Sequence, residues 1–130
     1  MEKMKILIVD DNKSVQALYN LGLKDEIYDK KFADNGKAAL EMHESWHPDL
    51  IVMDIMMPVM SGFQALKAIR DGEKKGGKTT AVVVATALSD KSDIIDCARL
   101  GIQGYIIKPF KHSEIAARLE SYYQKHLSGG

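Results

Sequence analysis

The sequence lacks the features of a secreted or membrane-spanning protein. Its single cysteine, Cys97, has no second cysteine with which to form an internal disulfide. Its longest unbroken aliphatic runs have four or five residues, as at 6–9 and 81–85, whereas a transmembrane helix needs about 20 apolar residues. Two aspartates follow the first of these runs directly, so the sequence also lacks the apolar core of a signal peptide. These absences predict a cytoplasmic protein that neither crosses nor binds a membrane.

The chain also lacks an excess of charge, because 18 basic residues balance 18 acidic ones. We therefore do not expect nucleic acid as a direct partner, since the net charge would not attract the protein to a polyanion. The 130 residues, 45% of them hydrophobic and 28% charged, suit one globular domain of ordinary size. We expect its core to extend from about residue 5 to residue 127, with residues 128–130 as a tail.

Short apolar runs alternate with stretches of helical spacing. Four runs rich in β-branched residues begin near residues 5, 50, 81 and 104, as is typical of strands buried on both faces of a parallel sheet. Charged residues interrupt a fifth candidate at 27–32, which we therefore place at a sheet edge. The apolar positions with helical spacing are Val15, Leu18 and Leu21; Ala38, Leu40 and Met42; Phe63, Leu66 and Ile69; Ile94 and Ala98; and Ile115, Leu119 and Tyr122. This alternation predicts an α/β fold of the flavodoxin-like type, a doubly wound five-stranded parallel sheet with five helices.

One sequence pattern matches a phosphate-binding loop but has the wrong context. Residues 72–79 fit G-x-x-x-x-G-K-[ST]. A phosphate loop leaves a strand and opens a helix, whose amide groups bind the phosphates. This segment instead follows a helical stretch and precedes the strand that begins at residue 81. We therefore expect a polar surface loop rather than a site of nucleotide hydrolysis.

A second pattern, at residues 43–47, matches the zinc motif H-E-x-x-H. Pro48 follows it directly and disfavours the helical conformation of His47, which we place at the end of a helix. The sequence offers no third ligand at the spacing of metalloproteases. We interpret these histidines as helix-end residues and not as metal ligands.

Polar residues follow four of the predicted strands. They are Asp10 and Asp11 after the first, Asp54 after the third, Thr86 after the fourth and Lys108 after the fifth. Ligands of open parallel sheets bind beyond the carboxyl ends of the strands, so we expect these side chains to meet there. Three carboxylates about 5 Å apart would repel by about 3 kcal/mol per pair at an effective dielectric of about 20, and a cation would relieve this repulsion. An oxygen-only site with room for water suits Mg²⁺.

Five motifs occur in the order found in receiver domains of two-component response regulators. They are Asp10-Asp11, the block at residues 54–62, Thr86-Ala87, Gly104-Tyr105 and Lys108-Pro109-Phe110. The chain resembles the stand-alone, chemotaxis-regulator-like members of this family from Lys5 to about Leu127. The resemblance implies that the chain is a single receiver domain.

The resemblance also implies specific roles for the acidic residues. Asp54 is the expected phosphoacceptor. Asp10 and Asp11 are expected to hold Mg²⁺ together with Asp54 and the backbone carbonyl of Met56. The implied function is a signalling switch that accepts a phosphoryl group from a phosphohistidine of a histidine kinase or histidine phosphotransfer protein, and that slowly loses it again.

Further roles follow from the same resemblance. Thr86 and Lys108 are expected to contact phosphoryl oxygens, and Tyr105 is expected to turn inward as Thr86 moves. A downstream target protein would then bind the face made by the fourth helix, the fifth strand and the fifth helix.

Two positions depart from the family pattern. Met56 and Leu88 stand where many members carry polar residues near the attacking water, and we expect them to tune the lifetime of the phosphoryl group. An alternative function is a receiver-like interaction module that binds its partner without phosphorylation. The presence of the acidic pair, Asp54, Thr86 and Lys108 favours the phosphorylatable switch.

Overall fold

The computed structural model describes residues 2–76, 78–87 and 91–129. Strands and helices alternate along this part of the chain, as the sequence predicts. Their bounds are β1 Met4–Val9, α1 Lys13–Gly22, β2 Tyr28–Ala33, α2 Gly36–Trp46, β3 Leu50–Asp54, α3 Gly62–Glu73, β4 Ala81–Ala87, α4 Lys91–Leu100, β5 Gly104–Lys108 and α5 His112–Leu127.

The five strands form one parallel sheet in the order β2-β1-β3-β4-β5. Strand β2 lies at an edge, as its interrupted apolar pattern predicts. The register pairs Val9 with Met53, Asp54 with Ala85, and Ala87 with Lys108. The carboxyl ends of β1, β3, β4 and β5 are therefore level with one another, and the predicted flavodoxin-like fold is confirmed.

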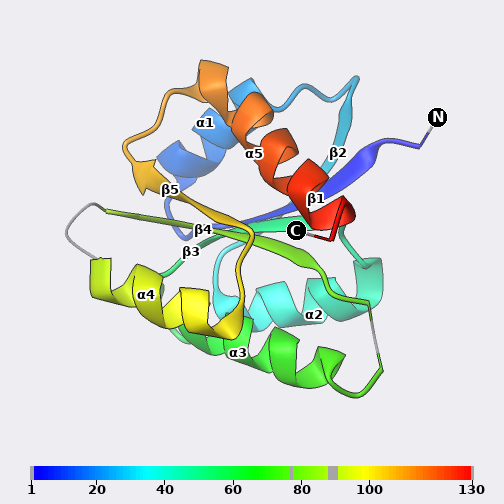
Figure 1. Ribbon diagram of the computed structural model, residues 1–130. Coiled ribbons are helices and arrows are strands. Elements are labelled where there is room, and N and C mark those ends of the chain that lie inside the picture. Colours follow the sequence, from blue (N-terminus) through cyan, green and yellow to red (C-terminus); the bar gives the residue numbers. More distant parts are fainter. Residues whose placement is uncertain (1, 77, 88–90, 130) are drawn as a thin grey trace.

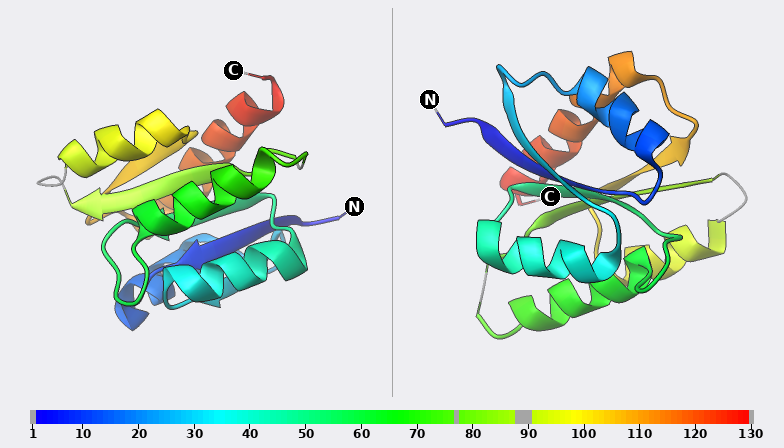
Figure 2. Two further views of the ribbon diagram at one scale, coloured as in Figure 1. Left: turned by 90° about the horizontal axis from the view of Figure 1, so that it is seen from below. Right: turned by 180° about the vertical axis from the view of Figure 1, so that it is seen from behind.

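Helices cover both faces of the sheet. Helices α1 and α5 lie on one face, and α2, α3 and α4 lie on the other (Figures 1 and 2). Because successive side chains of a strand point to opposite faces, Ile6 and Ile8 of β1 enter the core under α1 and α5, whereas Leu7 and Val9 enter the core under the other three helices. Two apolar cores thus hold the central strands, which position the polar residues that follow them.

Helix α1 is turned slightly from the orientation that its apolar spacing suggests. Leu21 is 64% exposed, although it shares a helical face with Val15 and Leu18. The buried residues of this helix are Gln16 and Tyr19. Gly22 of the same helix approaches α5 closely, and a β-carbon there would lie 2.3 Å from the carbonyl oxygen of His112. The buried face of α1 thus carries Gln16 and Tyr19, and Leu21 lies in solvent.

The segments that resemble nucleotide and zinc motifs adopt the conformations expected from their context. The segment with the phosphate-loop pattern connects α3 to β4, and its Gly77 lies outside the described residues. His47 ends α2 with a φ of 54°, in the left-handed region, and His43 Nε2 lies 3.0 Å from the Thr80 hydroxyl oxygen. None of the helices in the described part of the chain is both long and apolar enough to span a membrane.

Candidate functional site

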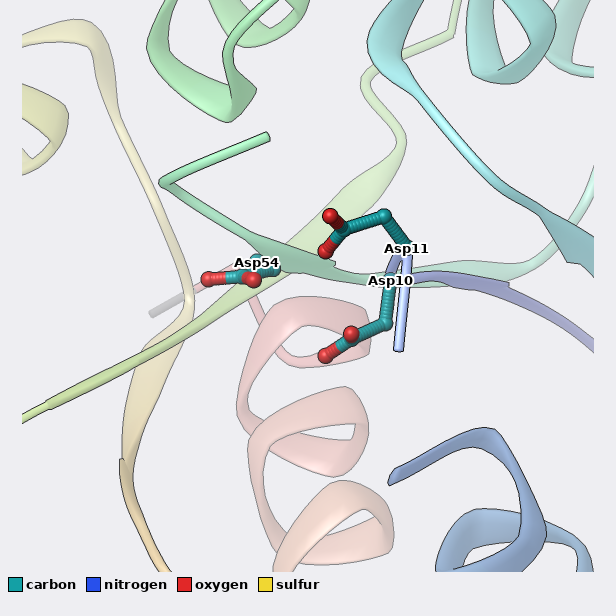
Figure 3. Close-up of side chains that lie close together, drawn as sticks. All are labelled: Asp10, Asp11 and Asp54. Carbon is teal, nitrogen blue, oxygen red and sulfur yellow. The ribbon is translucent and has the colours of Figure 1, made fainter. Parts of the chain in front are cut away.

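The carboxyl ends of β1 and β3 bring three carboxylates together. Asp10 and Asp11 directly follow β1, and Asp54 is the last residue of β3 (Figure 3). One carboxylate oxygen from each lies within 4.8 Å of the others. Asp10 is 1% exposed and Asp54 is 9% exposed, whereas Asp11 is exposed. The cluster therefore has two nearly buried members and one that is open to solvent.

Asp10 is held through its backbone and through both carboxylate oxygens. Its N–H donates to the carbonyl of Ala33 at 3.1 Å. Its Oδ1 accepts the N–H of Asn12 at 2.9 Å, and the side chain of Asn12 in turn caps the start of α1. Its Oδ2 accepts the ammonium of Lys108 at 2.7 Å. The buried carboxylate of Asp10 is therefore fixed in position by β2, α1 and β5.

Lys108 links two of the three carboxylates. Its Nζ lies 2.7 Å from Asp10 Oδ2 and 3.2 Å from Asp54 Oδ2. Burial would lower the pKa of Lys108, but its hydrogen bond and charge interactions with Asp10 and Asp54 outweigh burial and raise it. Lys108 is therefore a fixed positive charge at this site.

The surroundings of Asp54 disfavour the ionised form of its carboxylate. Burial raises its pKa above the ordinary value; the Lys108 ammonium lowers it and the Asp10 carboxylate raises it further. The cluster places three carboxylates beside one ammonium. The resulting negative charge favours an additional cation.

The backbone around Asp54 is folded back tightly. A β-carbon at Gly62 would lie 2.2 Å from the carbonyl oxygen of Asp54, so a side chain there would not fit without movement. The N–H of Gly62 donates to the carbonyl of Ile55 at 2.8 Å, and the N–H of Met56 donates to Asp54 Oδ1 at 3.3 Å. Ser61 caps the following helix, α3. The start of α3 thus packs directly against the end of β3 and orients Asp54.

The other candidate site residues predicted from the sequence differ in how far they are exposed to solvent. Thr86, the second-to-last residue of β4, is 1% exposed. Tyr105 on β5 is 46% exposed, and Met56 is 63% exposed in the loop that follows β3. Leu88 lies outside the described residues. The structure therefore places the acidic residues and Lys108 together, with Tyr105 on the surface.

The donor set of the acidic cluster fits a hard divalent cation. It consists of carboxylate oxygens, with neither sulfur nor imidazole nitrogen in the group. Mg²⁺ prefers one or two carboxylates and keeps several waters, and the exposed side of Asp11 leaves room for them. The acidic cluster of Asp10, Asp11 and Asp54 therefore fits a Mg²⁺ site.

The amino-acid sequence matches a known protein family over most of its length. The sequence model of the family described as the response regulator receiver domain matches residues 6–120, which include all three aspartates and Lys108. The chain belongs to this family. The resemblance inferred from the five motifs is thereby confirmed, and the chain is a receiver domain of the two-component response regulators.

Known relatives of this receiver domain include proteins of similar and of greater length. The chemotaxis protein CheY of Pseudomonas aeruginosa is 34% identical over 123 residues, which cover 94% of this chain and 98% of that protein. The probable transcriptional regulator ycf27 of Porphyridium aerugineum is 35% identical over 125 residues, 96% of this chain, and the chain spans 50% of that protein's length. The structure of the chemotaxis response regulator CheY4 of Vibrio cholerae superimposes with a TM-score of 0.81 at 28% identity, covering 93% of this chain and 99% of that one.

Two residues beside the acidic cluster of the receiver domain were not identified from the sequence. Gln16 Nε2 donates to the backbone carbonyl of Asp10 at 2.6 Å and to Asp34 Oδ1 at 2.8 Å. The signal that could have found Gln16 is its position three residues before the buried Tyr19, which places a polar side chain on the inward face of α1. Asp34 lies in the turn between β2 and α2, where an aspartate carries no distinctive signal.

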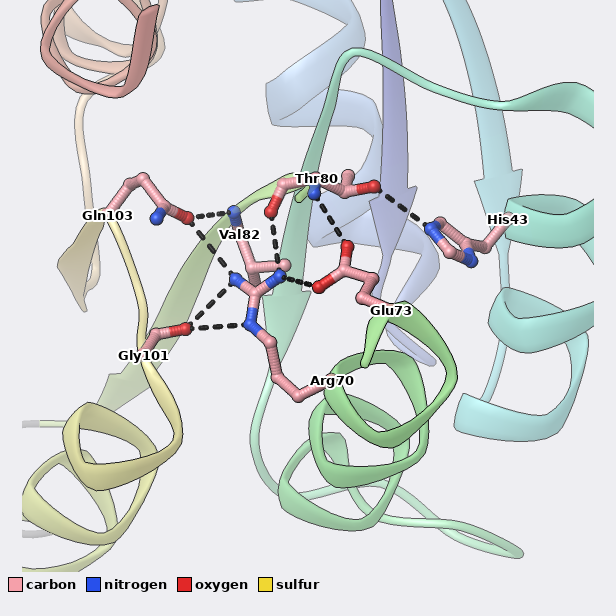
Figure 4. A network of polar contacts seen from close by, with 7 residues as sticks. All are labelled: His43, Arg70, Glu73, Thr80, Val82, Gly101 and Gln103. Atoms are coloured by element: carbon pink, nitrogen blue, oxygen red, sulfur yellow. Dashed lines mark hydrogen bonds and ion pairs between the residues drawn. The ribbon is translucent and has the colours of Figure 1, made fainter. Parts of the chain in front are cut away.

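A second polar network lies at the amino ends of β4 and β5 (Figure 4). Arg70 of α3 donates five hydrogen bonds, two to the carbonyl of Gly101 and one each to the Thr80 carbonyl, the Glu73 carboxylate and the Gln103 side chain. These bonds use the full donor capacity of a guanidinium group within the protein. The network therefore ties α3 to the sheet of the receiver domain and leaves no donor of Arg70 for a ligand.

Proposed function

We propose that this receiver domain is a phosphorylatable switch in which Asp54 accepts a phosphoryl group from a phosphohistidine of a histidine kinase or histidine phosphotransfer protein. The observation that carries the proposal is the position of Asp54 at the end of the central strand. The residue is 9% exposed, and its carboxylate lies 3.2 Å from the Lys108 ammonium and beside two further carboxylates. A nucleophilic carboxylate with a fixed cation and a cation-binding cluster suits phosphoryl transfer.

The proposed reaction forms one bond and breaks one. A carboxylate oxygen of Asp54 attacks phosphorus, the bond between phosphorus and the histidine nitrogen breaks, and the electron pair of that bond stays on the leaving nitrogen. Lys108, which contacts Asp54 Oδ2, is proposed to pair with a phosphoryl oxygen. Mg²⁺ bound by Asp10, Asp11, Asp54 and the Met56 carbonyl would neutralise the negative charge of the phosphoryl oxygens.

The proposed output involves the neighbouring strands. Thr86 of β4 is buried, and its hydroxyl is proposed to bond a phosphoryl oxygen of the modified Asp54. Tyr105, which the register pairs with Val84 of β4, is 46% exposed and is proposed to turn inward when Thr86 moves. The new surface of α4, β5 and α5 would then bind a downstream target protein. This is a population shift between two states, driven by a local change in charge.

The experiment is an intact-mass measurement after incubation with a small acyl phosphate. The wild type should gain one phosphoryl group in Mg²⁺ and none in EDTA, and Asp54→Asn should gain none in either buffer. Asp71→Asn is the matched control, because Asp71 is an exposed aspartate on α3. Equal labelling of the wild type and Asp54→Asn would contradict the assignment. A wild type that binds its partner but is never labelled would instead support an interaction module that works without phosphorylation.

A further inference from the structure

Residues 34–36, between β2 and the start of α2, contact the start of α1 on one side and the loop that follows Asp54 on the other. On one side, Asp34 Oδ1 accepts the side-chain amide of Gln16 and the ammonium of Lys13, each at 2.8 Å. On the other side, the N–H of Gly36 donates to the carbonyl of Met60 at 3.1 Å, within the loop between β3 and α3. These residues therefore link α1, which begins just after the acidic pair, to the loop after β3.

Gln16 is the link between residues 34–36 and the acidic pair. Its side-chain nitrogen donates to the backbone carbonyl of Asp10 at 2.6 Å and to Asp34 Oδ1 at 2.8 Å. A primary amide has two N–H groups, so these two bonds use the whole donor capacity of Gln16. The residue is 9% exposed and packs on the inward face of α1. Its amide is therefore fixed from two sides.

The bond from Gln16 restricts the peptide group that joins Asp10 to Asp11. The carbonyl of Asp10 and the nitrogen of Asp11 belong to one planar unit, so a rotation of this unit redirects the Asp11 side chain. The N–H of Asp10 is already bound to the Ala33 carbonyl at 3.1 Å, and the Gln16 amide holds the other end of the residue. Asp11 is exposed, so its direction toward the cluster depends on its backbone and not on packing around its side chain.

We propose that Gln16 is a positioning residue for the cation site, which orients the Asp11 carboxylate by holding the peptide group between Asp10 and Asp11. The inference rests on the Mg²⁺ site of the proposed function. A neutral amide suits this role, because it donates two hydrogen bonds without adding a positive charge that would compete with the cation. Groups that orient the ligands of a metal often affect its affinity by about 10-fold or more.

The test compares Mg²⁺ binding in variants that change the donors of Gln16. Gln16→Met keeps the length of the side chain and removes both donors, and Gln16→Glu places acceptors where the donors were. Gln124→Met, on the exposed side of α5, is the matched control. Mg²⁺ affinity is measured by calorimetric titration, and thermal stability is measured separately in EDTA. We expect an increase in the Kd for Mg²⁺ of about 10-fold in Gln16→Met, a smaller increase in Gln16→Glu, whose added negative charge attracts the cation, and no change in the control.

A second readout separates positioning from a structural role. In phosphorylation by an acyl phosphate, Gln16→Met should need more Mg²⁺ for half-maximal rate but should reach the wild-type rate at saturating Mg²⁺. A lower melting temperature in EDTA together with an unchanged Kd for Mg²⁺ would overturn the inference, since it would show that Gln16 only stabilises the fold.

A third variant covers the case in which neither Gln16 variant folds. Asp34→Ala removes the anchor of the amide at a side chain that is 59% exposed, so the fold should tolerate it. It should also weaken Mg²⁺ binding, by less than Gln16→Met does; an unchanged Kd in Asp34→Ala would then count against the inference. If the wild type itself bound no Mg²⁺, the proposed cation site would be contradicted together with this inference. If the wild type bound Mg²⁺ and all Gln16 and Asp34 variants bound it equally, the inference alone would be overturned.

Discussion

Removal of the charge of Asp54 is expected to stabilise the metal-free protein, although it removes the proposed phosphoacceptor. Asp54 lies beside two carboxylates, with oxygens within 4.8 Å of one another, and beside the Lys108 ammonium at 3.2 Å. Asp54→Asn keeps the shape of the side chain and an oxygen that accepts the N–H of Met56, but it ends the repulsion by Asp10 and Asp11. The variant therefore isolates the effect of the charge.

The size of the stability gain can be worked out from the distances between Asp54 and its charged neighbours. At an effective dielectric of about 20, two unit charges 4.8 Å apart interact by about 3.5 kcal/mol, and two charges 3.2 Å apart by about 5 kcal/mol. Solvent around the exposed Asp11 weakens its share, so repulsion and the attraction by Lys108 come close to cancelling, and the burial of the Asp54 charge is the main cost of ionisation. We expect Asp54→Asn to gain about 1 kcal/mol of unfolding free energy, or about 4 °C in Tm for a domain of this size.

The stability gain of Asp54→Asn over the wild type should depend on pH. Burial raises the pKa of Asp54 in the folded protein above its value in the unfolded chain. The ionised group therefore destabilises the fold fully above the folded pKa and not at all below the unfolded pKa. The advantage of Asp54→Asn should be present at neutral pH and should disappear as the pH falls below the pKa of the unfolded chain.

The assay is urea unfolding of the wild type, Asp54→Asn and the control Asp71→Asn, in EDTA and in Mg²⁺. At a Mg²⁺ concentration ten times its Kd, the wild type should gain about 1.4 kcal/mol from binding, and Asp54→Asn should gain less. The advantage of the variant should therefore shrink or reverse when Mg²⁺ is added. A loss of more than about 1 kcal/mol in Asp54→Asn in EDTA would refute the reasoning, since it would mean that favourable contacts of the carboxylate outweigh the repulsion.

Four further predictions concern other parts of the molecule. Arg70→Met should lose about 3 kcal/mol of stability in urea unfolding, because it leaves several partly buried acceptors, the Glu73 carboxylate among them, without their donor; a loss under about 1 kcal/mol would show that water replaces the guanidinium. Burial lowers the pKa of His43 from its ordinary value of 6.5, so the protein should lose stability as the pH falls below that value, and His43→Gln should lose less in a pH series of thermal melts. Val59 is 80% exposed and has a φ of 69°, a left-handed conformation that strains a β-branched residue. Val59→Asn should therefore gain about 1 kcal/mol of unfolding free energy in urea unfolding, and a loss of stability would show that the backbone at Val59 is not strained. We propose that Met56 and Leu88 prolong the lifetime of the phosphoryl group, so Met56→Asn and Leu88→Glu should each speed its hydrolysis, and more so together; an unchanged rate in the double variant, at matched Mg²⁺ and temperature, would disprove this.

The arrangement of the acidic cluster could be predicted because it follows from local patterns. Asp10 and Asp54 each come at the end of an apolar run, and level strand ends bring such residues together in a parallel sheet. The edge position of β2 followed in the same way, because its charges interrupt the apolar run. In these cases the information lies within a few residues of the chain.

Other features depend on contacts that local patterns do not encode. Gln16 is buried on α1, and its partner Asp34 is 18 residues away. Arg70 finds its acceptor at Gly101, 31 residues further along the chain. Such long-range pairs are set by how helices pack on the sheet, and local patterns do not indicate which partner a polar residue will contact.

The central claim is that Asp54 itself carries the phosphoryl group, and its most direct test is to locate the modification. After phosphorylation in Mg²⁺, borohydride reduction converts an aspartyl phosphate to homoserine, which tandem mass spectrometry then locates. Trypsin places Asp54 in the peptide of residues 38–67, and places Asp10 and Asp11 in the separate peptide of residues 6–13. We expect homoserine at position 54 and unmodified aspartate at positions 10 and 11. Homoserine at either member of the acidic pair, or an unreduced Asp54 in protein that has gained a phosphoryl group, would contradict this claim.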